Sequence, residues 1–213
     1  MLKSINPNII YVTVSGYKNS DAPGHDINFA AVAGHLGDRP PVPQCVDVAT
    51  GLAAAFVAAV AVATGRAGYF EVPMETTAYM LNLLNFAQLK HIGDLHLTGG
   101  YPFYNVYKCA GGSVALGAVE EKFWRRFVSI IGEDLGSRMY DREAVEEVQR
   151  EFAKVNCIEL LKKAAELDIP LSPVRTIQEV CHGVDLGEII RSIAPAGGSA
   201  PVLGEHNQLL DKL

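Results

Sequence analysis

Apolar residues along the first 90 positions alternate between short continuous runs and longer stretches with helical spacing. Short β-branched or aromatic runs predict strands at residues 8–16 and 69–72. Helices are predicted at 27–37, 48–65 and 74–89, the second of which is rich in alanine. This part of the chain therefore predicts strands that alternate with helices.

A second group of elements follows residues 92–100, which contain Gly and His and show no periodicity. The run "PFYNVYKCAGGSVALGAV" (102–119) predicts two strands joined by a turn at Ala-Gly-Gly. Amphipathic helices are predicted within 121–132 and 142–168. A strand, turn and helix follow in "IPLSPVRTIQEV", and the tail "APVLGEHNQLLDKL" ends with a helical pattern.

The order of these elements predicts an α/β part followed by a smaller α+β part. The boundaries that we expect are 1–80 for the first part, 81–100 for a linker, 101–185 for the second part and 186–213 for a C-terminal segment that returns to the first. The opening strand has no preceding strand with which to pair, so we expect it to be an orphan within this chain.

The alanine-rich stretch needs a separate test, because residues 48–65 carry no charge. Its length is near the lower limit for a membrane-spanning helix, but alanine is only weakly apolar. Asp47 and Arg66 bracket it tightly. The pattern favours a buried core helix, and we expect no membrane partner.

Composition narrows the function classes. Apolar residues make up 49% of the 213 residues and charged residues 20%, which is typical of a globular protein that forms a core. The net charge is −6 and basic residues do not cluster with aromatic ones, so no nucleic-acid partner is expected. The N-terminus lacks the apolar core of a signal peptide, which predicts a cytoplasmic protein.

The four cysteines lie far apart and form no Cys-x-x-Cys pair. They fit neither a zinc site nor the disulfide framework of a small secreted domain, so no metal is expected. They are Cys45, Cys109, Cys157 and Cys181.

Four acid–base residues are the candidates for chemistry. His25 and Asp26 follow a Pro/Gly-containing loop, Asp47 directly precedes the alanine-rich helix, and Glu120 follows the second hairpin strand. Each also has a structural interpretation: Asp47 as a helix cap, Glu120 as a first-turn glutamate, and His25 with Asp26 as loop residues. The spacing of these residues alone does not decide between a catalytic role and a structural role.

These residues lie in motifs that resemble the α-methylacyl-CoA racemase branch of the family III CoA-transferase/racemase family. "GHDINF" resembles the Gly-His-Asp-Ile-Asn-Tyr segment of that branch. The stretch from "PPVPQCVD" to "EVPM" resembles its proline turn, aspartate and alanine-rich helix. The run "GGYPFYNVYKCAGGSVALGAVEEKFW" is similar to a long and specific run of the branch. "IPLSPVRTIQEV" and "PVLGEH" match two further signatures, so the resemblance extends over nearly the whole chain.

The resemblance implies a family III CoA-transferase-like fold, with part of a Rossmann-like large domain and a small α+β domain in an interlocked homodimer. It also implies an enzyme that inverts the α-carbon of 2-methylacyl-CoA thioesters through an enolate, without a cofactor beyond the CoA of the substrate. His25, supported by Glu120, and Asp47, supported by Asp26, would be the two acid–base partners. A second carboxylate beside Asp47 would raise its pKa and suit it to donate a proton.

The same resemblance implies substrate contacts by Gly24, Asn28, Phe29 and Tyr101. Phe29 stands where the family usually has tyrosine, and the loop before His25 is shorter than in the family. The family's N-terminal segment is also absent, which predicts a separately encoded N-terminal subunit as a partner.

Two other functions stay open. A CoA-transferase of the same fold would use Asp47 as a nucleophile, and a non-catalytic remnant or structural subunit would keep the fold without turnover. His25 and Glu120 together favour the racemase.

Overall fold

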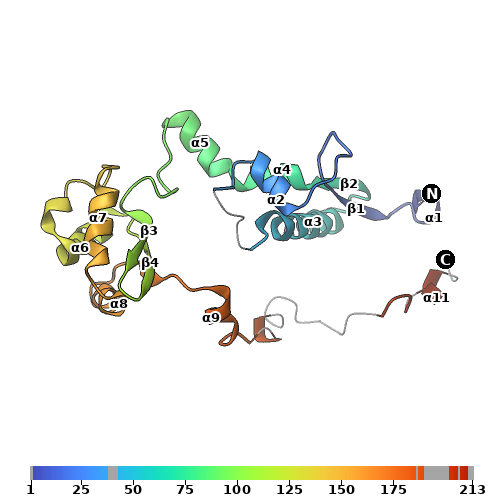
Figure 1. Ribbon diagram of the computed structural model, residues 1–213. Coiled ribbons are helices and arrows are strands. Elements are labelled where there is room, and N and C mark those ends of the chain that lie inside the picture. The colour runs from blue at the N-terminus through green and yellow to red at the C-terminus, as the bar shows by residue number, and fades with distance from the viewer. Residues whose placement is uncertain (1, 38–42, 186, 190–201, 206, 211–213) are drawn as a thin grey trace. The chain divides into compact units, whose positions relative to one another are not determined.

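The described residues of the computed structural model are 2–37, 43–185, 187–189, 202–205 and 207–210 (Figure 1). The chain divides into two units, Met1–Gly93 with Leu203–Leu213, and Asp94–Val202. The boundary between the units falls inside the predicted linker 81–100. Most of the predicted C-terminal segment 186–213 lies outside the described residues.

The first unit contains a parallel pair of strands and a set of helices. Its elements are α1 (Leu2–Ile5), β1 (Ile10–Ser15), α2 (Asp26–Val32), α3 (Cys45–Ala63), β2 (Gly68–Pro73), α4 (Met74–Leu81), α5 (Leu83–His91) and α11 (Asn207–Leu210). The single helix predicted at 74–89 is two helices, because the chain breaks at Asn82, whose side chain turns inward and donates to the Ala33 carbonyl at 2.6 Å. The predicted linker therefore begins later than residue 81.

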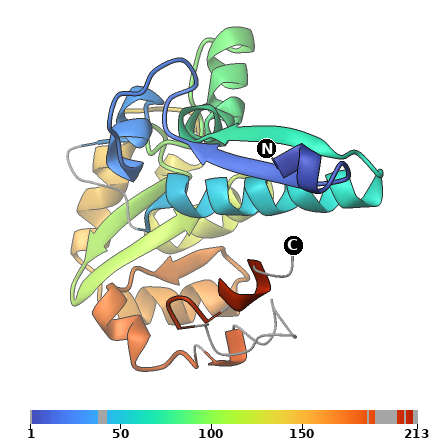
Figure 2. The ribbon, with the colours of Figure 1, turned by 90° about the vertical axis from the view of Figure 1, so that its right-hand side faces the viewer.

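Strands β1 and β2 pair in parallel, from Ile10 opposite Gly68 to Ser15 opposite Pro73. The expectation that the opening strand is an orphan is therefore wrong, because the α3 crossover returns the chain beside it. Figure 2 shows the two strands side by side with α3 running along them. A parallel pair needs such a crossover, which a two-residue turn cannot supply.

Helix α3 is less buried than predicted. Val46, Thr50 and Ala61 are buried on the side that faces β1 and its neighbours. On the outer side Leu52 and Phe56 are 66% and 70% exposed. The expectation of a buried core helix is therefore wrong for this chain by itself. By length and composition, α3 would also be able to cross a membrane, with a mean hydropathy of 2.1.

The second unit is built on a three-stranded antiparallel sheet in the order β3-β4-β5. Its elements are β3 (Tyr104–Cys109), β4 (Gly112–Gly117), α6 (Glu121–Ile131), the 3₁₀-helix η1 (Glu133–Leu135), α7 (Ala144–Ala153), α8 (Cys157–Glu166), β5 (Leu171–Pro173) and α9 (Ile177–Cys181). The predicted hairpin forms as expected, and Gly111 takes a φ of 93° at its turn, a conformation that favours glycine.

Large aromatic side chains fill the core of the second unit. Trp124 and Phe127 of α6 pack against each other at a tilt, and Phe127 also contacts Phe152 of α7. Phe152 stacks on Tyr107 of β3 at a ring-centroid distance of 4.9 Å. The Tyr107 hydroxyl donates to the Pro102 carbonyl at 2.7 Å, and burial raises the pKa of this hydroxyl. The core thus pins the hairpin to the helices that follow it.

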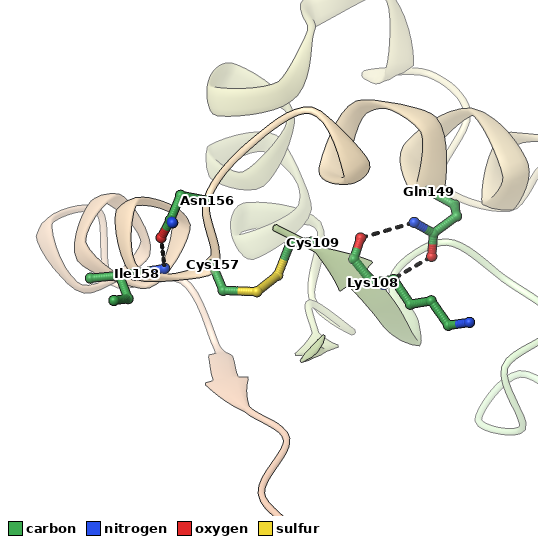
Figure 3. The surroundings of a disulfide bond; sticks show 6 residues. All are labelled: Lys108, Cys109, Gln149, Asn156, Cys157 and Ile158. Carbon is green, nitrogen blue, oxygen red and sulfur yellow. Dashed lines mark hydrogen bonds between the residues drawn. A yellow bond between two sulfur atoms is a disulfide. The ribbon is translucent and has the colours of Figure 1, made fainter. Parts of the chain in front are cut away.

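A disulfide between Cys109 and Cys157 joins the end of β3 to the start of α8 (Figure 3). The sequence did not predict this pair, because the two cysteines are 48 residues apart. Backbone bonds align the same segments: the Ala110 N–H donates to the Val155 carbonyl, and the Cys157 N–H donates to the Ala110 carbonyl, both at 3.0 Å. Beside them, Gln149 exchanges two hydrogen bonds of 2.9 Å with the Lys108 backbone.

We expect Cys109→Ser to lower the free energy of unfolding by about 2–4 kcal/mol, the usual worth of a disulfide that closes a loop of this size. Chemical denaturation followed by tryptophan fluorescence measures the change, because Trp124 lies in the same core. Cys181→Ser is the matched control, since Cys181 is free and exposed. Four reactive thiols in the unfolded, unreduced chain would contradict the pairing.

Candidate functional site

His25 occupies the N-cap position of α2, directly after the loop that leaves β1. Its backbone is extended (φ −126°, ψ 175°), and its N–H donates to the Asn28 side-chain oxygen at 3.0 Å. Asn28 therefore fixes the backbone of His25, in the manner of the N3 residue of a capping box. His25 is exposed and directly precedes the first residue of the short helix α2.

Asp26 connects α2 to α3. Its carboxylate is buried, with 6% of the residue exposed, and its Oδ1 atom accepts the backbone N–H groups of Val46 and Asp47 at 2.8 and 3.0 Å. These N–H groups belong to the first turn of α3, where no intrahelical acceptor is available. Asp26 thus brings the starts of both helices together, although they are distant in the sequence.

Asp47 lies in the first turn of the 19-residue helix α3, and its residue is exposed. The positive end of the helix dipole favours a carboxylate at this position. Asp26 holds the backbone N–H of Asp47, whereas its predicted effect on the chemistry of the Asp47 carboxylate stays a prediction. His25, Asp26 and Asp47 therefore gather at the N-termini of α2 and α3.

The loop after β1 lies at the carboxyl end of the parallel pair, which is where open α/β sheets bind ligands. Glu71 of β2 accepts the Ser15 hydroxyl at 2.6 Å, and Glu75 accepts the Lys18 N–H at 3.2 Å. A depression of about 390 Å³ is lined here by residues 15–21 and Glu71. The carboxyl end is therefore open and polar.

Glu120 belongs to the second unit and is the N-cap of α6. Its carbonyl accepts the N–H groups of Phe123 and Trp124 at 2.9 and 3.1 Å, while the residue is exposed. The backbone of Glu120 therefore starts the helix and leaves the carboxylate free of any cap bond to α6. Its partnership with His25 stays a prediction, because the two residues lie in different units.

The other predicted contact residues are placed differently. Gly24 directly precedes His25 and is half-buried, whereas the Phe29 ring is fully buried in the core of the first unit. Its core neighbours are Ala30, Ala33, Val46 and Ala78. Phe29 therefore packs inside the unit, and its predicted contact with the substrate stays a prediction.

Tyr101 is buried in the second unit, where its hydroxyl donates to Asp94. Arg142 pairs with the same carboxylate and lies 4.7 Å from the centre of the Tyr101 ring. The bond from Tyr101 lowers the pKa of Asp94, and the same bond raises the pKa of Tyr101. Sequence patterns did not predict the pairing of Asp94 with Arg142, because the two residues are 48 positions apart.

The family of the chain follows from a match over almost its entire length. The model of the family described as "CoA-transferase family III" matches residues 1–207. The chain belongs to CoA-transferase family III. Its match includes the segments that carry His25, Asp26, Asp47 and Glu120, so the geometry described above is that of a member of this family.

Two curated relatives are alpha-methylacyl-CoA racemases. The human protein is 30% identical over 213 aligned positions, which cover 85% of this chain and 56% of that protein. The mouse protein is 29% identical, with 83% and 54% covered. The chain therefore spans about half the length of the racemases it matches.

Solved structures share the fold. The Mycobacterium tuberculosis protein Rv3272, titled a hypothetical protein, superposes with a TM-score of 0.73 at 21% identity, covering 98% of this chain and 70% of that one. A Brucella suis protein of the CAIB/BAIF family gives 0.66 at 16% identity, covering 99% and 69%. The mixed α/β fold expected from the resemblance is confirmed.

Among the described residues, Asp26 is the only one whose side chain accepts hydrogen bonds from the first turn of α3, and Asp26→Ala removes it. We expect it to lower the free energy of unfolding by about 1–3 kcal/mol, the usual cost of leaving buried donors unpaired. Asp26→Asn keeps an acceptor oxygen and should cost less.

Denaturant titrations followed by circular dichroism measure both changes. Asp21→Ala, which alters an exposed loop aspartate, serves as the control and should stay within about 0.5 kcal/mol of the wild type. Equal stability of Asp26→Ala and Asp21→Ala would show that Asp26 does not hold α3.

Proposed function

We propose that this chain is part of an acyl-CoA racemase or epimerase that inverts the α-carbon of 2-methylacyl-CoA thioesters. The observation that carries the proposal is the bond network of Asp26, which gathers His25 and Asp47 at two adjoining helix N-termini. The similarity to two alpha-methylacyl-CoA racemases supports the same substrate class. No cofactor beyond the CoA of the substrate is needed.

The proposed reaction moves one proton off the α-carbon and one proton on. One of His25 and Asp47 takes the α-proton, and the electron pair of the broken C–H bond moves onto the thioester oxygen to give an enolate. The other residue returns a proton from the opposite face, so no oxidant or reductant is consumed. The positive end of the α3 helix dipole is suited to stabilise the enolate charge.

Glu120 is proposed to support His25 in its protonated form, as the resemblance implies. A carboxylate near an imidazole favours the imidazolium. Exposure of Glu120 at the start of α6 leaves its side chain available for such a contact.

A CoA-transferase is the second candidate, and the family description favours it. Asp47 would attack an acyl-CoA carbonyl, form an acyl anhydride and release the CoA thiolate. The exposure of Asp47 at a helix N-terminus suits this step as well. The two reactions differ in whether the α-hydrogen is exchanged.

If the chain is part of a racemase, deuterium from heavy water should enter the α-carbon of a 2-methylacyl-CoA. We expect His25→Ala and Asp47→Ala each to reduce exchange by about 10²–10⁴-fold, the usual contribution of a general acid–base group. The two variants should affect the two enantiomers unequally, because each residue serves one face. Proton NMR of each enantiomer measures this.

His182→Ala is the matched control and should exchange like the wild type. Acyl transfer without deuterium incorporation, or an acyl adduct trapped on Asp47, would replace the racemase with the transferase. Wild-type rates in both His25→Ala and Asp47→Ala would end the assignment of this pair.

We also propose a protein partner that completes the first unit. Parallel sheets are normally covered on both faces, and two strands alone are marginal. Among the described residues, each strand of the β1–β2 pair has one neighbour, and Val48, Leu52 and Phe56 form an exposed apolar row on α3. The partner is proposed to bring further strands, in an assembly with two copies of this chain.

If such a partner exists, co-expression with it should change the solubility and the CoA-thioester binding of this chain. The chain should become more soluble and bind CoA thioesters only when it is produced with a polypeptide that corresponds to the remaining part of its racemase relatives. Light scattering and isothermal titration measure the two properties. Tight thioester binding by a soluble, isolated chain would refute the proposed partner. If α3 is the contact, Phe56→Glu should weaken the complex with the partner.

A further inference from the structure

The loop that delivers His25 begins and ends against one aromatic ring. Gly16 directly follows β1, and Gly24 directly precedes His25. A methyl group added to Gly16 would lie 3.2 Å from the Phe29 Cζ atom, and one added to Gly24 would lie 2.9 Å from the same atom. The tip of the Phe29 ring therefore lies against both ends of the loop.

The ring itself has little freedom to move. Phe29 is fully buried, and Tyr17 packs edge-on against it at a ring-centroid distance of 4.9 Å. A methyl group on Gly24 would also come within 3.2 Å of the Tyr17 ring. Because protein interiors are close-packed, a group added here displaces the backbone of the loop rather than the ring.

Glycine is needed at position 24 because a larger side chain would collide with the Phe29 ring. The backbone conformation is not the reason, since Gly24 is not among the described glycines with a positive φ. Gly24 and Phe29 stand at N′ and N4 of α2, the positions of a hydrophobic staple, which sets the angle at which the chain enters a helix. Here the N′ residue has no side chain, so the ring contacts its backbone directly. His25 is the next residue.

We propose that Gly24 and Phe29 act together as positioning residues for His25, because the ring tip fills the space beside Gly24 and fixes the backbone that carries the imidazole. This inference rests on the proposed function of His25. Cζ is the ring atom nearest to both glycines.

The test is a compensating pair of substitutions in the full chain, measured in the assembly that catalyses exchange. Gly24→Ala should lower kcat for α-proton exchange by about 10–100-fold with little change in KM, since small displacements of a catalytic group carry costs of this order. Phe29→Leu removes Cζ and should cost less. The double variant should recover most of the loss.

Gly37→Ala is the matched control, because a methyl group there meets nothing within 4 Å. Its kcat and thermal midpoint should equal those of the wild type. Circular dichroism accompanies each measurement. If Gly24→Ala does not fold, folding restored in the double variant supports the inference, and an unfolded double variant counts against it.

A second measurement does not depend on activity. With ¹³C-labelled histidine, the ring resonance of His25, assigned with His25→Gln, should shift in Gly24→Ala and return in the double variant, while that of His91 stays in place. An unmoved His25 resonance, or an equal shift in both variants, would overturn the positioning role. If the His25 resonance shifts in Gly24→Ala and returns in the double variant, but the wild-type protein exchanges no α-proton, only the proposed function is refuted.

Discussion

The carboxylate of Asp26 holds the first unit in the form on which its candidate chemistry depends. A buried carboxylate is costly unless hydrogen bonds replace its lost water, and Oδ1 receives two N–H groups from the first turn of α3. In the same contact the open donors of α3 gain an acceptor. Since Asp26 begins α2 and follows His25, one carboxylate sets both helix starts and the position of both proposed acid–base residues.

The two units differ in what their own cores supply. The second unit encloses Trp124, Phe127, Phe152 and Tyr107 and adds a disulfide, so its hairpin and helices are tied together internally. In the first unit Phe29 is the one large side chain of the core cluster among the described residues. The apolar surface of α3 remains in water, which is the physical basis for proposing a partner.

The residues around His25 show how a loop can hold a side chain in a fixed place. Asn28 holds the backbone N–H of His25 from one side, and the Phe29 ring lies against Gly24 from the other. The first contact is polar and directional, and the second depends only on shape. Together they restrain the residue before the helix, where the chain would otherwise have rotational freedom.

Local patterns in the sequence determined most of the elements, because strand and helix preferences arise from short-range sterics and from the spacing of apolar residues. They predicted β1, α3, β2, the β3–β4 hairpin and the candidate residues His25, Asp26, Asp47 and Glu120. The break at Asn82 was not predicted, because its cause is a bond to Ala33, far away in the chain.

Only the tertiary structure decided which distant surfaces meet. The pairing of β1 with β2, the exposure of α3, the Cys109–Cys157 bond and the capping of α3 by Asp26 each join segments that are remote in sequence. None of them leaves a periodic signal, since a contact between remote segments depends on how whole elements pack. Residue types and their local order thus set the elements and the candidate chemistry, and packing set the neighbours of each residue.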